Sequence, residues 1–442
     1  MSDFLIRAGE FVWGPGTILL IVGTGIWFTV GTRFLQLRRL PQIVRCTVGS
    51  LFKRQGVSKK GGITPFQAVS TALAGTMGTG NIAGIATAIV AGGPGAIFWM
   101  WVSAFFGMMT KYAEVVLAVR YRRREPNGSF SGGPMAYIED GLGKPLLSSF
   151  FSICCVLASF GIGNATQVHS AAAALYGSFG IHPTTTGVVA AILTALVIMG
   201  GIGRIGKVAE SAIPLVSLFY LAGGGLVLWM NRAAIPAALA LIVKSAFTPA
   251  AAAGGVGGYG IMTAIRIGVA RGIFSNEAGL GSAPMAHASA DAKSPAEQGY
   301  WGIFEVFADT LLVCTFTALI ILTTEGLWLS GADGSALTSA AFYLCLGSTG
   351  EWIVSLSLAC FALATLFCWG YYGERGIAAL TGGKRGFILG YRVVFVLVAM
   401  VAPTLNLTLV WNVADLLNGL MALPNIFAVL ALSGEVFAAT KA

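Results

Sequence analysis

The stretch of sequence that decides the fold reads Thr71-Ala-Leu-Ala-Gly75-Thr76-Met77-Gly78-Thr79-Gly80-Asn81-Ile-Ala-Gly84. It lies within a long apolar segment, yet it carries four glycines, three threonines and an asparagine. Lipid cannot satisfy bare backbone groups, so a helix break at membrane depth is tolerated only beside protein or a water-filled site. Many secondary transporters build their substrate and ion sites on such broken helices. The stretch therefore predicts a binding site inside a membrane.

A second interrupted segment follows in the other half of the chain. It runs from the glycine-rich stretch at 254–260 to Arg271-Gly-Ile-Phe274-Ser275-Asn276-Glu277-Ala-Gly279. One interruption in each half is typical of a transporter built from an inverted repeat.

The composition indicates an integral membrane protein. Of 442 residues, 56% are hydrophobic and 10% are charged, whereas soluble domains contain about 25% charged residues. The formal charge of +9 comes from basic residues in loops between apolar spans, which favours a topology signal over a nucleic-acid surface. Seven cysteines without a CxxC pair indicate neither a disulfide framework nor a metal cluster. The N-terminus lacks the features of a signal peptide, so we expect the first span to be retained.

A membrane helix needs about 20 mainly apolar residues, and the sequence predicts about eleven such spans. They fall near 12–32, 64–91, 95–119, 148–176, 185–201, 208–230, 257–283, 300–323, 351–371, 386–403 and 406–433.

The charges of the loops predict the topology. The loop at 33–60 holds eight basic residues and no acid, whereas the loop after the eighth span holds Glu325, Asp333 and Glu351 and no basic residue. The rule that cytoplasmic loops are basic then predicts that the N-terminus lies outside and the C-terminus in the cytoplasm. We expect the protein to lie in the cell inner (plasma) membrane. Arg232 and Lys244 fall on the unexpected side.

These spans predict an all-α polytopic protein with an extra first helix before a five-plus-five inverted repeat. We expect a first helix and a cytoplasmic amphipathic segment (35–54) within 1–61. The first five-helix repeat would cover 62–232, an interfacial linker 233–253, and the second repeat 254–442.

The first break offers groups for both an ion and a carboxylate. Unwound carbonyls around 75–80, with the hydroxyls of Thr76 and Thr79, suit a hard cation. The half-helix that restarts near Asn81 presents free N–H groups and a positive dipole end, which suit a substrate carboxylate. Close packing by small residues is the alternative, but the density of Gly, Thr and Asn favours a site.

The second break adds an amide, an aromatic ring and an acid. Asn276 can donate and accept hydrogen bonds, and Phe274 can close a pocket. Glu277 is an intramembrane carboxylate and hence a functional candidate. We expect it instead to pair with Arg266 or Arg271, because a carboxylate in the cavity would repel a carboxylated substrate.

Other polar residues interrupt the apolar spans. Asn164 and Gln167 lie three apart and would share one helix face, although hydrogen bonds between helices alone could account for them. Thr365 and Trp369 form an i/i+4 pair. The remaining intramembrane candidates, as ion-pair partners or proton carriers, are Asp309, with the adjacent Thr310, and Asp415.

Several enzyme classes are excluded. The three histidines lack metal-ligand spacing, and the chain has no phosphate-binding loop and no nucleophile elbow. Gly78-Thr-Gly80-Asn-Ile-Ala83 matches a dinucleotide fingerprint, but that motif has meaning only in a βαβ unit. We expect neither an enzyme nor an organic cofactor.

At these motifs the chain resembles the alanine/glycine–cation symporter family, the sodium–alanine symporters. The resemblance rests on Gly78-Thr-Gly80-Asn81-Ile-Ala-Gly84, Gly92-Gly-Pro-Gly95-Ala-Ile-Phe-Trp99-Met-Trp101, Lys111-Tyr-Ala-Glu114, Gly132-Gly-Pro-Met135, Ser275-Asn276-Glu277-Ala-Gly279-Leu-Gly-Ser-Ala-Pro284-Met-Ala-His287-Ala and Phe307-Ala-Asp309-Thr310.

The resemblance implies a leucine-transporter-type fold and sodium-driven uptake of a small neutral amino acid, alanine or glycine, by alternating access. Sodium would be the coupling ion, held by backbone oxygens near Gly75 and Gly78 with Thr365. The implied substrate pocket consists of Thr76, Gly78, Asn81, Gln167, Phe274, Asn276 and Trp369.

Three other functions compete with this one. In a proton-coupled transporter of small amino acids, Glu277, Asp309 or Asp415 would titrate. A channel or membrane scaffold would leave the paired breaks unexplained. An intramembrane enzyme would need a nucleophile and a base that the sequence does not provide.

Overall fold

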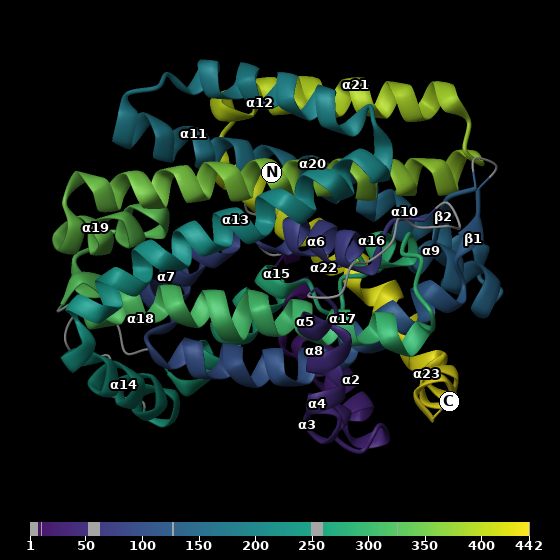
Figure 1. Cartoon of the computed structure of the whole chain (residues 1–442), viewed down its shortest axis with the longest axis horizontal. Helices are drawn as coiled ribbons and strands as arrows, with labels where there is room; N and C mark the ends of the chain where they lie inside the picture. Colours follow the sequence, from purple (N-terminus) through teal and green to yellow (C-terminus); the bar gives the residue numbers. More distant parts are fainter. Residues whose placement is uncertain are drawn as a thin grey trace.

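The computed structural model describes residues 8, 9, 11–51, 62–125, 128–248, 260–324 and 326–441. In this part of the chain the only paired strands form a short hairpin, β1 (Arg123–Arg124) with β2 (Phe130–Ser131). The long helices run across the view as stacked rods, with α14 and α19 at one end and the hairpin at the other (Figure 1).

Helices up to the middle of the chain have the following bounds. They are α2 (Pro15–Gly31), α3 (Leu35–Arg38), α4 (Leu40–Cys46), α5 (Val48–Leu51), α6 (Pro65–Thr76), η1 (Gly80–Gly84), α7 (Ile85–Gly92), α8 (Gly95–Arg120), α9 (Pro134–Ala136), η2 (Tyr137–Gly141), α10 (Pro145–Phe160), η3 (Gly161–Ala165), α11 (Thr166–Phe179), α12 (Pro183–Ile198), α13 (Gly201–Met230), η4 (Arg232–Ala234) and α14 (Ile235–Phe247).

The helices of the second half have the following bounds. They are α15 (Ile261–Asn276), α16 (Pro284–Ala288), α17 (Pro295–Val306), η5 (Phe307–Cys314), α18 (Thr315–Thr323), η6 (Leu327–Leu329), α19 (Gly334–Leu346), α20 (Ser348–Thr381), α21 (Arg385–Val401), η7 (Ala402–Thr404), α22 (Leu407–Ala431) and α23 (Ser433–Lys441).

The first predicted break is present between α6 and α7. A capping box starts α6, because the Thr64 hydroxyl accepts from the Gln67 N–H at 3.1 Å and the Gln67 side chain accepts from the Thr64 N–H at 3.0 Å. The helix ends at Thr76, and the helix that resumes at Gly80 is bent from it by 52°.

The second predicted break follows α15. This helix ends at Asn276, and Glu277 has a left-handed backbone with φ of 55°. Gly279 and Gly281 also have positive φ, where glycine carries no penalty, and α16 starts only at Pro284. The glycines predicted at 254–259 lie outside the described residues.

Seven described helices are long and apolar enough to cross a membrane, or eight if the bent α6–α7 pair is one span. The predicted first, fifth and seventh spans fall on α2, α12 and α15, each of 16 or 17 residues. The count of eleven therefore stays a prediction. The sequence missed α19, an apolar helix in the predicted loop after the eighth span.

The amphipathic segment at 35–54 is not one continuous helix. Within the described residues it forms three short helices, α3, α4 and α5. Pro41, in the first turn of α4, has no N–H and its ring opposes continuation of the preceding helix. At this junction Arg39 donates a hydrogen bond to the Tyr300 hydroxyl at 3.2 Å. Residues 52–54 lie outside the described part.

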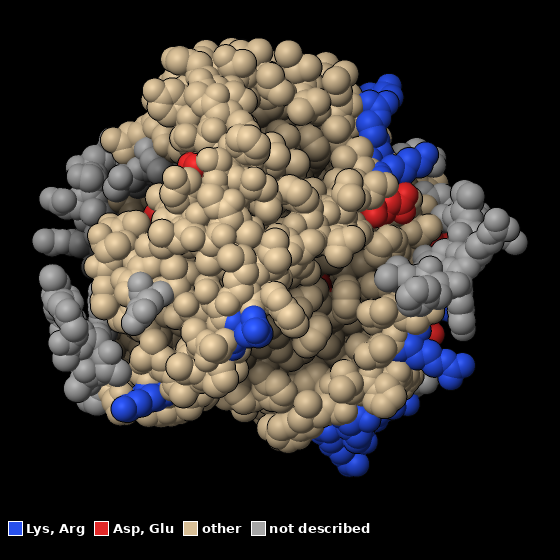
Figure 2. Space-filling view, turned by 60° about the vertical axis from the view of Figure 1, so that its left-hand side comes forward, with Lys and Arg blue, Asp and Glu red and all other residues tan. Residues whose placement is uncertain are grey.

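Ion pairs gather at the C-terminal end of α20. Arg375 lies 3.3 Å from both Glu125 and Glu374, and Arg392 lies 2.8 Å from Glu374. Near the hairpin, the Arg123 guanidinium donates hydrogen bonds to the carboxylate of Asp140, and this interaction raises the pKa of Arg123. When the opposite end is turned forward, most of the visible face carries neither charge, and basic side chains lie mainly toward the right-hand margin (Figure 2).

A very close helix contact joins η3 to α20. A Cβ atom added to Gly163 would lie 2.1 Å from the Trp369 Cβ, far inside van der Waals contact. Trp369 itself is completely buried. Only glycine at 163 lets the two helices approach this closely.

We therefore expect Gly163→Ala to displace Trp369 and to lower the free energy of unfolding by about 2 kcal/mol, as overpacking does. Thermal unfolding of the purified protein in detergent would measure it. Gly203→Ala is the matched control, since a Cβ there meets nothing within 4 Å. Equal melting temperatures for the two variants would contradict the assigned contact.

Candidate functional site

Two N–H groups released by the first break are satisfied by side chains. The Gly78 N–H donates to the Asn81 side-chain oxygen at 3.1 Å, and the Thr79 N–H donates to Gln167 Oε1 on α11 at 3.2 Å. The side-chain oxygens of Asn81 and Gln167 thus occupy two backbone N–H groups of the break. The same N–H groups could bind an anionic group of a ligand.

Gly78 is the point where three predicted residues meet. A Cβ there would lie 2.7 Å from Thr365 Oγ1 and 2.9 Å from Gln167 Oε1. The Thr365 hydroxyl donates to the Met77 carbonyl at 3.4 Å. Glycine at 78 therefore brings the unwound backbone against polar oxygens from both α11 and α20.

The predicted sodium site has suitable oxygens at this point. The Met77 carbonyl and the Thr365 hydroxyl lie together, and the Thr79 hydroxyl is buried without a hydrogen-bond partner among the described residues. Oxygen donors of this kind suit a hard cation. Gly75 faces α20 differently, since its added Cβ would lie 3.1 Å from Cys368 Sγ.

Thr76 does not join this cluster through hydrogen bonds. Its hydroxyl donates to carbonyls of its own helix, those of Ala72 at 3.3 Å and Leu73 at 3.4 Å. The residue is buried at the end of α6, one position from the carbonyl that Thr365 contacts.

At the second break, Asn276 caps its own helix end. Its side chain accepts from the Ala278 N–H at 3.0 Å and donates to the Thr310 hydroxyl at 3.1 Å. Phe274 packs on Trp411 of α22 with ring centroids 5.2 Å apart. The sequence did not single out Trp411.

The carboxylate of Asp309 joins the two breaks. It accepts hydrogen bonds from Asn81 Nδ2 at 2.7 Å and from Ser275 Oγ at 2.8 Å. A third comes from Thr310 Oγ1 at 2.7 Å. Asp309 is fully buried, and among the described residues it has no ion-pair partner. Neutral donors from both breaks thus stabilise one intramembrane charge.

Wide π-helical turns lie beside each of these contacts. They are η1 at the first break, η3 just before Gln167, and η5, which contains Asp309. Such turns often occur at functional sites. The turn at η3 also explains why the predicted common face of Asn164 and Gln167 is wrong. Asn164 donates to the Phe395 carbonyl on α21 at 2.8 Å, while Gln167 turns toward the first break.

The predicted pairing of Glu277 with Arg266 or Arg271 is wrong. Glu277 Oε1 accepts from the Trp369 indole at 3.0 Å, and its other oxygen accepts from the Ser282 hydroxyl. Because α15 has ended in a left-handed turn, the carboxylate leaves the face of that helix. Arg271 instead lies 5.8 Å from the Phe274 ring. Glu277 therefore positions the indole of Trp369.

A buried polar cluster beside the second break was missed. Lys111 lies 3.2 Å from Glu305, and Glu305 also contacts His287 at 3.0 Å. Glu114 accepts from the Gly281 N–H at 3.1 Å, in the loop after the break. The signal was available, because Lys111 and Glu114 are charges within an apolar span.

The comparisons with known proteins agree with this geometry. The model of the sodium:alanine symporter family matches residues 1–442. The chain belongs to the sodium:alanine symporter family. It is 48% identical over 442 aligned residues to the sodium/alanine symporter AgcS of Methanococcus maripaludis, covering 98% of this chain and 95% of that protein.

Other members of the family carry different names. The chain is 39% identical to the probable sodium/glutamine symporter GlnT of Bacillus subtilis, with 98% of this chain and 89% of that protein covered. It is 36% identical to the putative sodium/proton-dependent alanine carrier protein YrbD of Bacillus subtilis, with 100% and 92% covered. The chain is thus a multi-pass membrane transporter and not an enzyme.

Solved transporters share the fold. A Na⁺-coupled sialic acid symporter aligns with a TM-score of 0.55 at 12% identity, covering 97% of this chain and 85% of that one. A mutant manganese transporter of Eremococcus coleocola gives a TM-score of 0.53 at 16% identity, with 84% and 78% covered. At such identities the likeness shows the fold alone.

We expect Asp309→Asn to uncouple the two breaks. An asparagine would point N–H donors at groups that already donate, so the variant should lose about 3 kcal/mol of folding free energy and most of its transport. Thermal unfolding and substrate uptake by the reconstituted protein would measure this. Asp333→Asn, an exposed acid at the start of α19, serves as the control. Wild-type stability and uptake in Asp309→Asn would contradict the bridging role.

Proposed function

We propose that this protein couples sodium influx to the uptake of a small neutral amino acid, alanine or glycine, by alternating access. The observation that carries the proposal is the meeting of two helix breaks at one buried site, joined through Asp309. Membership of a sodium-coupled family supports sodium as the driving ion.

The proposed substrate pocket consists of Thr76, Gly78, Asn81, Gln167, Phe274, Asn276 and Trp369. Its carboxylate end would lie at the first break. There the amide oxygens of Asn81 and Gln167 accept from the N–H groups of residues 78 and 79, and a substrate carboxylate would take over these donors. Such an exchange replaces neutral hydrogen bonds with stronger charge-assisted ones.

Bulky side chains support a small substrate. Trp369 is buried and held by Glu277, and Phe274 is backed by Trp411. A rigid wall excludes larger side chains by steric clash, which discriminates more sharply than the loss of a favourable contact. We expect these rings to admit only a methyl group or a hydrogen atom as the substrate side chain.

The proposed sodium site uses backbone oxygens near Gly75 and Gly78 with the Thr365 hydroxyl. It lies beside the proposed carboxylate position, because Thr365 and Gln167 approach Gly78 from two helices. Opposite charges bound side by side in a low-dielectric site attract each other, so each ligand raises the affinity for the other. That reciprocity is the basis of the proposed coupling.

Helix lengths support the proposed five-plus-five repeat. The 35-residue span Pro145–Phe179 in the first half corresponds to the 34-residue α20 in the second. The 16-residue α12 likewise corresponds to the 17-residue α21. The basic hairpin and the ion pairs of α20 support a cytoplasmic location for that end of the molecule.

Uptake of radiolabelled alanine into proteoliposomes tests the function. Accumulation under an inward sodium gradient, competed by glycine but not by leucine, is the expected result. Potassium and proton gradients serve as controls. Uptake driven only by protons would favour the proton-coupled alternative, and no uptake by folded protein would refute the substrate assignment.

Variants at the proposed site test its assignment. Thr365→Ala removes a hydroxyl ligand and should raise the sodium concentration for half-maximal uptake about tenfold, which corresponds to the loss of one hydrogen-bond-sized interaction. Asn81→Ala should instead weaken alanine binding. Thr381→Ala, whose hydroxyl only bonds its own helix at the far end of α20, is the matched control. Sodium dependence unchanged in Thr365→Ala would exclude this ligand.

A further inference from the structure

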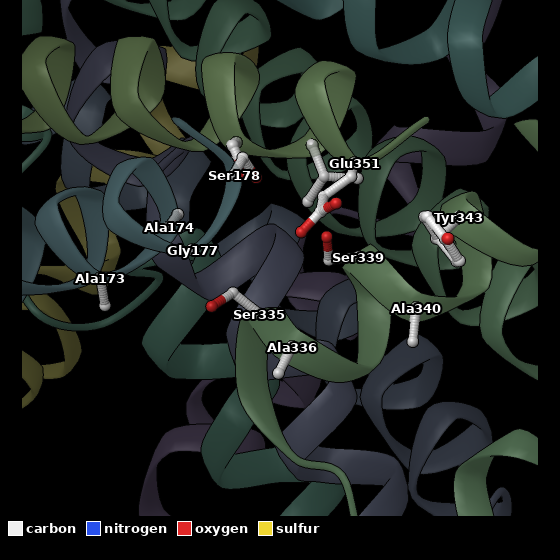
Figure 3. A pocket seen from close by; sticks show the side chains of 12 residues that line it. Ala173, Ala174, Gly177, Ser178, Ser335, Ala336, Ser339, Ala340, Tyr343 and Glu351 are labelled. Carbon is white, nitrogen blue, oxygen red and sulfur yellow. Dashed lines mark hydrogen bonds between the residues drawn. The ribbon is translucent and has the colours of Figure 1, made fainter. Parts of the chain in front are cut away.

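A hollow lies apart from the site, among α11, α19 and α20. Its volume is about 600 Å³, large enough for a small solute with its water. Small and hydroxyl-bearing side chains from all three helices line it (Figure 3): Ala173, Ala174, Gly177, Ser178, Ser335, Ala336, Ser339, Ala340, Tyr343, Glu351, Val354 and Ser355. We call it the α19 cleft.

Glu351 is the only charged residue among the described residues that line the α19 cleft. Its carboxylate has no hydrogen bond or ion pair to any side chain in the part of the chain that the structure describes. In Figure 3 the carboxylate points toward the hydroxyl of Ser339 and the open space. Ser178 and Ser355, by contrast, bond each other at 2.6 Å. The cleft therefore offers one unpaired negative charge beside hydroxyl groups.

The helix ends at the cleft differ in sign, because α19 and α20 begin there whereas α11 ends there. Gly177 and Ser178 belong to the last turn of α11, which ends at Phe179. Free carbonyls give the C-terminus of a helix a partial negative charge. No described lysine or arginine lines the cleft to oppose it. The N-terminal turns of α19 and α20 carry the opposite partial charge, so the carboxylate of Glu351 is the group that favours a positively charged ligand.

The dimensions favour an ammonium group over a bare metal ion. A bare cation needs several oxygens packed around it, whereas among the described residues only Glu351 brings a carboxylate to the lining of this wide hollow. An ammonium group needs one carboxylate and a few acceptors, with water filling the rest.

The α19 cleft shares two helices with the proposed transport site. Gln167 precedes the lining residue Ala173 on α11 by six residues, and Thr365 follows the lining residue Ser355 on α20 by ten, which is roughly 9 Å and 15 Å along the two helices. Thr338, between the lining residues Ser335 and Ser339, donates to the Ile82 carbonyl of η1 at 3.1 Å. One wall of the cleft is thus bonded to the broken helix.

The cleft faces away from the basic end of the molecule. It lies at the N-terminal end of α20, whereas Arg375 and its ion pairs lie near the other end of this 34-residue helix. Such a helix is roughly 50 Å long, enough to cross a bilayer. If the basic end is cytoplasmic, the cleft opens to the outside.

We propose that the α19 cleft is an outer loading site, in which Glu351 binds the ammonium group of the amino acid before it moves to the transport site. This inference rests on the proposed function, since it requires that the protein take up a zwitterion from outside. The chain would then bind two substrate molecules, one at each site.

Kinetics in proteoliposomes give the first test. Glu351→Gln keeps the shape of the side chain and removes its charge, so kcat/KM for sodium-driven alanine uptake should fall about tenfold while kcat is retained, as expected when a steering charge is lost. Glu351→Asp should restore most of kcat/KM. Thr349→Ala, an exposed neighbour outside the cleft, is the matched control.

Binding stoichiometry gives the second test. Equilibrium dialysis with radiolabelled alanine should find about two sites in the wild type and one in Glu351→Gln. In Asn81→Ala, which weakens the transport site, the remaining site should be competed by alaninamide, which has the ammonium group. N-acetylalanine, which lacks it, should not compete.

The outcomes separate the two proposals. Alanine uptake by the wild type with an unchanged kcat/KM in folded Glu351→Gln would overturn the loading site and leave the proposed function standing. Loss of a bound ²²Na⁺ ion, rather than of alanine, in that variant would also overturn it. No sodium-driven alanine uptake by the wild type would overturn both.

Discussion

A single buried carboxylate sets the relative position of the two helix breaks. Asp309 has no ionic partner among the described residues, so its charge is tolerated only because Asn81, Ser275 and Thr310 all donate to it. Leaving a buried charge without donors would cost several kcal/mol. The first break, the second break and the π-helical turn of η5 are therefore held in one arrangement, and the proposed substrate and sodium positions depend on it.

Neutral hydrogen-bond donors also satisfy other buried acids near Asp309. Glu277 is satisfied by Trp369 and Ser282, and Glu114 by the loop after the second break. Each buried acid fixes one irregular segment of backbone. Several buried polar groups thus gather where the chain leaves regular helix.

Much of this could be predicted from the sequence. Glycine and threonine density gave the position of the first break, and residues 274–279 gave that of the second, because lipid leaves few uses for such residues. The family motifs led to the family itself. The partners of Glu277 were not predictable, since the left-handed turn at this residue reverses the direction of its side chain. Nor was the divergence of Asn164 and Gln167, because the sequence does not reveal a π-helical turn. Trp411 and Ser282 reach their contacts only through tertiary structure.

The glycine contacts of α20 restrict how the molecule can change shape. Gly163 fits against Trp369, and an added Cβ at Gly373 or Gly376 would approach Ser159 Oγ to 2.5 Å or the Ser152 carbonyl to 2.9 Å. These close contacts at glycines occur at several points along α20, where it packs against α10 and η3. Sliding α20 along α10 would therefore cause steric clashes. These contacts hold α10, η3 and α20 together as one rigid unit. The proposed opening and closing would then fall to the unwound segments, where side chains such as Asn81 and Gln167 replace part of the regular helical hydrogen bonding.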